Sequence, residues 1–288
     1  MKLIKPSYQI IEPTGYTIDN IYKSIELVGR VSHKSEDRIT EDSAKTFVEK
    51  MMKMKHLSTC EFGTIYLKIP VTHWGYLHYS GEDSEYDFDY FPTHRCINPY
   101  SRMTIVDNMA YITTNYRVLV ENNWLNDLKY LCEPTEYHHK RYTVKFICDR
   151  GILAEFTRHR KFSFMAESSR YNNYSKDKFG NELTFIKPCW LTGGMKSNLT
   201  YLEWETTLQE IEKSYLMLTK NGWKAEEARS ILPLSLKTEL YMCGFAEDWK
   251  KFFELRSKKY GVGNPHPQAD ELATPLYEEF IKRGYINE

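Results

Sequence analysis

The sequence lacks a long apolar run, and it contains little glycine and proline. No stretch approaches the roughly 18 consecutive apolar residues of a membrane-spanning helix, and none follows the two lysines at the start. We therefore expect neither a membrane span nor a signal peptide. The chain has 14 Gly and 11 Pro in 288 residues, less than the average usage of about 12%. A long flexible linker is not expected, and a chain of this length can bury a core of its own.

None of the six cysteines belongs to a Cys-x-x-Cys pair. This excludes the common structural zinc and dithiol redox motifs, and it indicates a reducing, cytoplasmic environment. Cys132, His138 and His139 lack a fourth ligand at a familiar spacing, so no metal site is predicted. Pro188-Cys189 resembles the surroundings of a cysteine nucleophile only superficially, because no neighbour in sequence would activate the thiol.

The chain has no net charge, because 39 Lys and Arg balance 39 Asp and Glu. Nucleic-acid-binding domains generally carry a basic excess, so a general polyanion binder is not expected. An aromatic content of 15% excludes a disordered chain.

Apolar periodicity predicts an α+β fold, with a central antiparallel or mixed sheet flanked by helices and a mostly helical C-terminal half. We expect strands at 63–69, 110–118 and 143–148. Residues 72–108 are expected to be irregular, with a solvated acidic and aromatic loop between Glu82 and Phe91. Helices are expected at 17–30, 41–55, 123–131, 204–218, 224–232, 246–257 and 270–282, and a helix or a tight turn into one at about 151–160.

The densest cationic group is Arg158-His159-Arg160-Lys161, and Arg170 follows ten residues later. Arginine is costly to bury without an anion, and its planar guanidinium matches phosphate or carboxylate. Ser168 and Ser169 add hydroxyl and backbone N–H groups suited to phosphate oxygens. Apolar residues interleave with the cations, which argues against the alternative of a solvated basic face. The residues alone predict a site for a phosphorylated ligand.

The spacing of Arg158-His159-Arg160, seven residues, then Ser168 and Arg170 resembles the signature of the flavin-dependent thymidylate synthases. Upstream, His56-Leu57-Ser58-Thr59-Cys60-Glu61 resembles the family's His-x-Ser/Thr-x-x-Glu segment. The C-terminal half is similar at 228–233 and 253–256. The resemblance covers about 41–70 and 143–285, so residues 1–288 are expected to form one domain with an inserted segment at about 71–142.

The resemblance implies a homotetramer with active sites shared between subunits, and no nucleic-acid partner. Such enzymes bind FAD, dUMP, methylenetetrahydrofolate and NADPH. Reduced flavin supplies the hydride that completes a methyl group on the uracil ring, which gives dTMP. No enzymic cysteine nucleophile is required.

The resemblance also implies a role for each matching residue. Arg256 would be catalytic, lying at the pyrimidine edge and stabilising negative charge there. Arg170 would bind the phosphate of dUMP, with Arg229 as a second nucleotide arginine. The complete dUMP set is Glu155, Arg158, Glu167, Ser168, Ser169, Arg170, Arg229 and Arg256. The FAD set is His56, Ser58, Glu61, Arg158, His159 and Arg160.

Some positions depart from the family pattern, and they concern the flavin contacts more than the nucleotide site. Met165-Ala166 stands where the family usually has Asn-Glu, with Glu167 one step later, and Glu155 stands where it usually has Gln. Flavin-contacting Asn and Arg are common near 245–251, where this chain has Phe245, Glu247 and Lys251. The alternative function is a non-catalytic module that binds a nucleotide or nucleic acid through residues 158–170.

Overall fold

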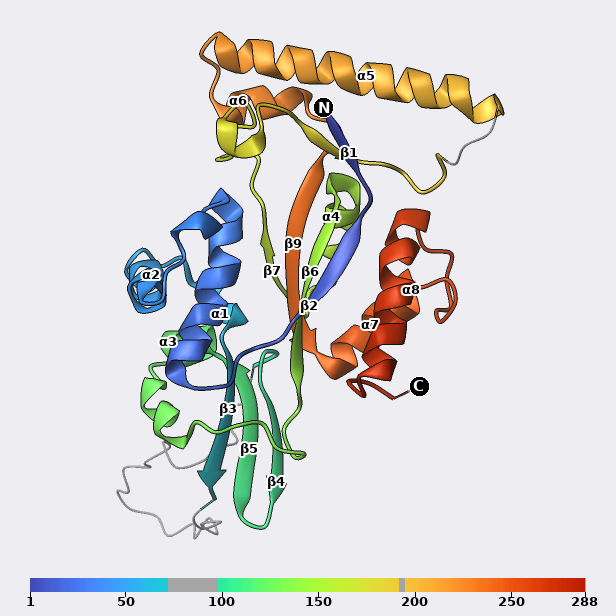
Figure 1. The fold of residues 1–288 in the computed structure, drawn as a ribbon. Helices are drawn as coiled ribbons and strands as arrows, with labels where there is room; N and C mark the ends of the chain where they lie inside the picture. The colour runs from blue at the N-terminus through green and yellow to red at the C-terminus, as the bar shows by residue number, and fades with distance from the viewer. Residues whose placement is uncertain (72–97, 192–194, 288) are drawn as a thin grey trace, which may run out of the picture. The chain divides into compact units, whose positions relative to one another are not determined.

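The computed structural model describes residues 1–71, 98–191 and 195–287 (Figure 1). The chain divides into two compact units. Unit 1 consists of Met1–Ile11, Gly29–Arg38 and Thr143–Glu288, and unit 2 consists of Glu12–Val28 and Ile39–Tyr142. The organisation as one domain with an insertion at about 71–142 stays a prediction.

Unit 1 is built on a four-stranded sheet with the order β2-β6-β9-β7. The strands are β2 (Ser7–Ile11), β6 (Arg141–Asp149, whose first two residues fall in unit 2), β9 (Lys237–Phe245) and β7 (Ser163–Ala166). β2 pairs antiparallel with β6, and β7 pairs antiparallel with β9. A separate parallel pair joins β1 (Lys2–Ile4) to β8 (Thr184–Ile186). The mixed α+β architecture expected from the sequence is confirmed.

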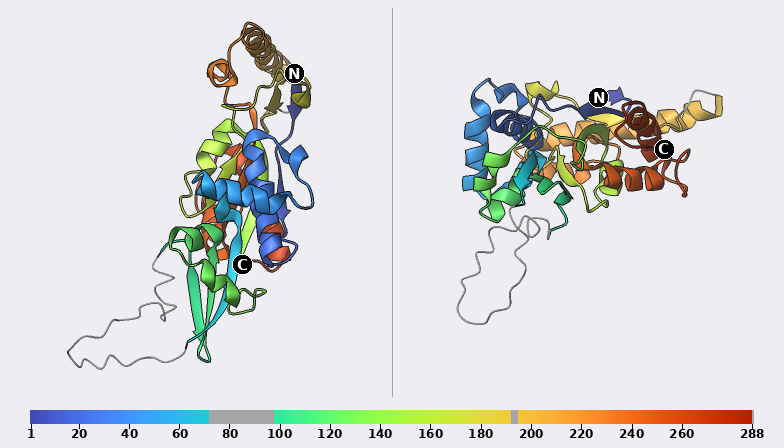
Figure 2. Two further views of the ribbon diagram at one scale, coloured as in Figure 1. Left: turned by 90° about the vertical axis from the view of Figure 1, so that its left-hand side faces the viewer. Right: turned by 90° about the horizontal axis from the view of Figure 1, so that it is seen from below.

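The helices of unit 1 supply an aromatic core beside this sheet. Trp249, Phe252 and Phe253 of α7 are fully buried, and the ring centroids of Trp249 and Phe280 of α8 lie 5.3 Å apart. Figure 2 gives two further views of these helices. Their bounds are α4 (Arg150–Phe156), α5 (Met195–Lys220), α6 (Ala225–Ala228), α7 (Ala246–Arg256) and α8 (Pro267–Lys282).

Unit 2 contains a three-stranded antiparallel sheet with the order β3-β5-β4. Asp107 and Asn108 join β4 to β5 with φ angles of 48° and 59°, as a tight two-residue hairpin requires. Gly63, just before β3, lies so close to α1 that a Cβ at this position would be 2.7 Å from Cδ1 of Ile25. The elements are α1 (Ile18–Arg30, whose last two residues fall in unit 1), α2 (Ser43–Lys53), β3 (Thr64–Pro70), β4 (Arg102–Val106), β5 (Met109–Asn115) and α3 (Tyr116–Glu121).

Several sequence predictions are wrong in detail. β9 lies in the part expected to be mostly helical, and β4 lies within 72–108, the segment expected to be irregular. The predicted strand at 110–118 ends at Asn115, because the side chain of Asn115 accepts a hydrogen bond from the N–H of Val118 and caps α3. Residues 125–130 form a 3₁₀-helix rather than an α-helix. The acidic and aromatic run between Glu82 and Phe91 lies outside the described residues.

Candidate active site

The structure brings together three predicted site residues from two distant parts of unit 1. Arg256, in the last turn of α7, donates from Nη1 to Oε2 of Glu155 at 2.5 Å and from Nη2 to the carbonyl oxygen of Glu155 at 2.9 Å. Its Nε donates to Nε2 of His159 at 3.0 Å. The side chain of Arg256 is only 17% exposed. A guanidinium held by three hydrogen bonds has a fixed orientation, which suits it to a directional contact with a ligand.

His159 is uncharged at neutral pH. It packs against Phe252 with ring centroids 5.1 Å apart. Burial, and then the charge of Arg256, lower the pKa of His159 from 6.5 to about 4. Because Nε2 accepts the hydrogen bond from Arg256, the ring proton lies on Nδ1.

The two arginines of the Arg-His-Arg motif lie at the surface. The motif occupies the turn between α4 and β7, and a hydrogen bond from the N–H of Phe162 to the carbonyl of His159 closes this turn at 3.1 Å. Arg158 and Arg160 are exposed, and neither side chain bonds to another residue in the described ranges. Both guanidinium groups are therefore available to an anionic ligand.

Glu167, the residue after β7, is buried. Its Oε2 accepts from Nζ of Lys237 at 2.8 Å, and its Oε1 accepts from the hydroxyl of Tyr174 at 3.1 Å. The same lysine lies 2.7 Å from Oε1 of Glu239. Burial alone would raise the pKa of Glu239, but three lysines bonded to it hold that pKa well below its usual value. They are Lys34, Lys145 and Lys237.

The predicted serines follow this buried network. The N–H of Ser168 donates to the carbonyl of Ser32 at 3.1 Å, and Ser168 is partly exposed while Ser169 is buried. Next to them, the ring of Tyr171 stacks on His33 with centroids 4.4 Å apart. The backbone of this loop is thus held by Ser32, and of the two serines only Ser168 reaches the surface.

Arg170 pairs with Glu226, and the charge of Arg229 also acts on this carboxylate. Nε of Arg170 donates to Oε2 of Glu226 at 3.0 Å, although the arginine side chain is 55% exposed. Hydrogen bonding and charge from Arg170, with a smaller contribution from Arg229, lower the pKa of Glu226. Arg170 thus forms an exposed ion pair with Glu226, and exposed ion pairs of this kind are weak.

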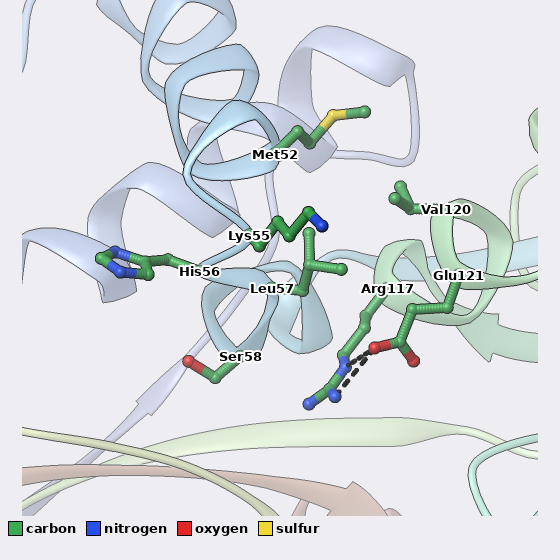
Figure 3. A pocket seen from close by; sticks show the side chains of 8 residues that line it. All are labelled: Met52, Lys55, His56, Leu57, Ser58, Arg117, Val120 and Glu121. Atoms are coloured by element: carbon green, nitrogen blue, oxygen red, sulfur yellow. Dashed lines mark hydrogen bonds and ion pairs between the residues drawn. The ribbon is translucent and has the colours of Figure 1, made fainter.

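In unit 2, His56 and Ser58 line a cavity of about 640 Å³ (Figure 3). Lys55, two residues after the end of α2, has a left-handed φ of 56°, which turns the chain toward His56. In Figure 3, His56 points away from Arg117. The cavity is lined by Met52, Lys55, His56, Leu57, Ser58, Arg117, Val120 and Glu121.

Glu61, the third residue of the upstream motif, is held by Arg117. Nη1 of Arg117 donates to Oε1 of Glu61 at 2.6 Å, and its Nε donates to Glu121 at 2.9 Å. The carboxylate of Glu61 is therefore already paired with Arg117, one of the residues that line the cavity.

Sequence reasoning missed Lys237, Glu239, Arg117 and Glu226. Lys237 and Glu239 are two residues apart, which places their side chains on the same face of a strand. Had β9 been predicted as a strand, this ion pair could have been predicted from the sequence. Arg117 and Glu121 have the spacing of a helical ion pair, which could have been found from the sequence.

Two alternatives receive no support. Burial, and then the charge of Glu271, raise the pKa of the Cys189 thiol, which makes it a poor nucleophile. In the described part of the chain, no group of three or more His, Cys, Asp and Glu side chains could hold a metal ion. No helix within these residues is long and apolar enough to cross a membrane.

Fold and site together define a mixed α+β protein in which a half-buried arginine, Arg256, contacts the motif turn and two exposed arginines, Arg158 and Arg160, lie on it. A family model described as thymidylate synthase complementing protein matches residues 105–283. The match covers more than half of the chain, so the chain belongs to this family, and the resemblance inferred from the motifs is confirmed. The matched range includes residues 105–142, within the segment predicted to be inserted.

Curated proteins that are similar in sequence are named as flavin-dependent thymidylate synthases. The chain is 31% identical over 146 residues to a probable flavin-dependent thymidylate synthase of Paramecium bursaria Chlorella virus 1, which covers 49% of this chain and 66% of that protein. It is 28% identical over 136 residues to the flavin-dependent thymidylate synthase of Pyrococcus abyssi, which covers 47% of this chain and 52% of that protein. The matches thus span between half and two thirds of these relatives.

One solved structure matches over most of the length of both chains. The crystal structure of the UMP/dUMP methylase PolB from Streptomyces cacaoi, bound with 5-Br UMP, matches with a TM-score of 0.48 and 14% identity. The match covers 98% of this chain and 92% of that one.

Proposed function

We propose that the protein is an FAD-dependent thymidylate synthase acting in the cytoplasm. It converts dUMP to dTMP with methylenetetrahydrofolate as carbon donor and NADPH as reductant, as a homotetramer with active sites shared between subunits. Family membership and the names of the curated relatives support this proposal. The observation that carries it is the convergence of Arg256 on Glu155 and His159, about a hundred residues away in sequence.

The exposed arginines bind the phosphate of dUMP. The guanidinium of Arg170 exchanges the carboxylate of Glu226 for the phosphate, with Arg229 alongside and Arg158 available from the motif turn. Arginine binds phosphate through two parallel hydrogen bonds, which are stronger than an exposed ion pair. The hydroxyl of Ser168 and the backbone of Ser169 complete this set.

Arg256 acts on the pyrimidine ring. Negative charge develops at the N3 edge as the ring is activated, and a fixed guanidinium aimed at it stabilises that charge. Glu167 cannot serve as a free base, because Lys237 and Tyr174 already occupy its two oxygens. The dUMP role predicted for Glu167 is therefore limited to holding the loop on which Ser168 and Arg170 lie.

The residues of the unit 2 cavity fit the diphosphate of FAD. Lys55, Arg117 and the hydroxyl of Ser58 supply donors, and Met52, Leu57 and Val120 supply apolar surface. Its volume lies within the range of small-molecule sites, about 300–1,000 Å³. When bound, the flavin supplies the hydride that completes the methyl group. The predicted flavin roles of Arg158, His159 and Arg160 belong to this proposal.

An absorption spectrum tests the proposal. The protein, reconstituted with FAD and freed of excess by gel filtration, is expected to retain flavin absorbance, and dUMP is expected to perturb that spectrum. A colourless protein that binds a single-stranded oligonucleotide more tightly than dUMP would instead support the non-catalytic module.

A further inference from the structure

Unit 1 contains a cavity of about 360 Å³, within the range of small-molecule sites, about 300–1,000 Å³. The lining side chains that bear on ligand binding are Lys2, Lys178, Lys237, Glu167, Tyr174 and Thr184. Neither Ser168 nor Arg170 lines the cavity, so it is separate from the phosphate site proposed for dUMP.

Three strands and one turn bring the lysines together. Lys2 of β1 and Thr184 of β8 are direct partners in the parallel pair, so their side chains lie on the same face of that pair. Lys237 begins β9, and Lys178 lies in the 3₁₀ turn Asp177–Phe179. Residues far apart in the sequence thus place three lysines around one cavity.

Each of these lysines keeps a donor for a ligand. An ammonium group has three N–H donors. Nζ of Lys237 donates to two carboxylates, at 2.8 and 2.7 Å, and Nζ of Lys178 donates to two backbone carbonyls, both at 3.2 Å. The side chain of Lys2 is bonded to no other residue in the described part of the chain. One N–H therefore remains on Lys178 and on Lys237, and all three remain on Lys2.

Positive charge exceeds negative charge around the cavity, although the whole chain is neutral. Two carboxylates face the three lysines. Both oxygens of Glu167 already accept hydrogen bonds, from Lys237 and from the hydroxyl of Tyr174. The side chain of Glu182 is 39% exposed, so solvent screens its charge. The cavity therefore favours an anionic ligand.

The same lining supports binding rather than a reaction. The hydroxyl of Tyr174 donates to Glu167, and burial raises the pKa of this phenol. Neither group is thus placed to exchange a proton with a ligand. The rings of Tyr174 and Phe179, with centroids 5.1 Å apart, add apolar surface beside the charged groups.

We infer that this cavity binds a small organic anion with two or more negative charges, of the class of phosphomonoesters and di- or tricarboxylates. Ammonium groups act as point charges and suit either phosphate or carboxylate oxygens. Three of them on separate elements favour several anionic groups on one ligand over a single one, and the aromatic rings accommodate its carbon skeleton. The inference does not depend on the proposed function.

Calorimetric titration with citrate, glycerol 3-phosphate and acetate tests this site. We expect citrate or glycerol 3-phosphate to bind one molecule per chain, at least about tenfold more tightly than acetate, and to raise the melting temperature. The tighter of the two shows whether carboxylate or phosphate is preferred. If neither binds more tightly than acetate, the inference is wrong.

Substitutions locate the bound anion. K2Q should weaken binding of the preferred probe about tenfold, as for a lost charged hydrogen bond, and K2Q/K178Q should weaken it further. Lys2 is exposed and makes no side-chain bond in the described ranges, so K2Q leaves the fold intact. K176Q, at an exposed lysine outside the lining, is the matched control and should stay within about twofold of the wild type.

Two results would overturn the inference even if an anion binds. Equal affinity in the wild type and in K2Q/K178Q would place the anion on other cations of the chain. Complete displacement of the probe by dUMP would assign the binding to the nucleotide site. A protein that binds the probe through Lys2 but neither flavin nor dUMP would instead contradict the proposed function alone.

Discussion

Nζ of Lys237 lies 2.8 Å from Oε2 of Glu167, and both side chains are largely buried. Lys237 is on β9 and Glu167 is the residue after β7, so this ion pair ties the loop after β7 to one of the two inner strands of the unit 1 sheet. The loop that carries Ser168 and Arg170 thus depends on a residue about seventy positions later in the chain.

Removal of Lys237 is expected to destabilise the protein. K237M leaves the buried carboxylate of Glu167 with only the Tyr174 hydroxyl, and breaking a buried pair in this way costs about 3–5 kcal/mol. Urea unfolding measures the loss. K259M, at the exposed pair with Glu278, is the control and should leave the free energy of unfolding nearly unchanged, because exposed ion pairs are weak. Equal effects of the two substitutions would show that the Lys237 pair is not buried in solution.

Arg170 and Glu226 should have opposite effects on dUMP binding. R170A removes a charged phosphate contact and is expected to weaken binding by on the order of tenfold to a hundredfold. E226Q removes the anion that competes with the phosphate and should strengthen binding about two- to fivefold, the scale of an exposed ion pair. Isothermal titration calorimetry measures both. Unchanged affinity in R170A would remove Arg170 from the site.

His159 makes stability depend on pH in a defined window. Its pKa in the folded protein is about 4, below the value of 6.5 for a free histidine. The unfolded chain therefore binds the proton first as pH falls, so the stability from neutral His159 is complete above about pH 6.5 and is lost toward pH 4. The wild type should lose stability relative to H159Q across this window. A difference between the two that does not vary with pH would contradict the buried, neutral state.

Gly63 is expected to tolerate no side chain. In G63A, the new Cβ would lie 2.7 Å from Cδ1 of Ile25 and 2.9 Å from Cγ2 of Ile21, inside the unit 2 core. Overpacking of this kind costs about 1–3 kcal/mol. A Cβ at Gly263 would meet no heavy atom within 4 Å, so G263A is the control. Thermal unfolding compares them, and equal melting temperatures would mean that the approach of Gly63 to α1 is looser than described.

The sequence predicts local features better than distant ones. The helix around Trp249, Phe252 and Phe253 is recognisable because its apolar residues recur at helical spacing. β9 escapes recognition because eight of its nine residues are buried, and a strand buried on both faces shows no alternation of polar and apolar residues.

The same contrast between local sequence patterns and distant contacts holds for the candidate site. The motif spacing identifies Glu155, His159 and Arg256 as site residues, but not that the first two bind the third. That contact depends on how α7 packs beside α4, which sequence spacing does not encode. The partners Lys237, Glu226 and Arg117 escape prediction for the same reason, since each acts on a residue at least 56 positions away.

The release of tritium from dUMP labelled at C5 tests the central claim most directly. With FAD, NADPH and methylenetetrahydrofolate present, the wild-type protein is expected to release tritium to water and to form dTMP, and R256Q is expected to do so at least tenfold more slowly, the scale of a lost donor to developing charge. A flavin-loaded wild-type protein that releases no tritium, or an R256Q variant as fast as the wild type, would contradict the account.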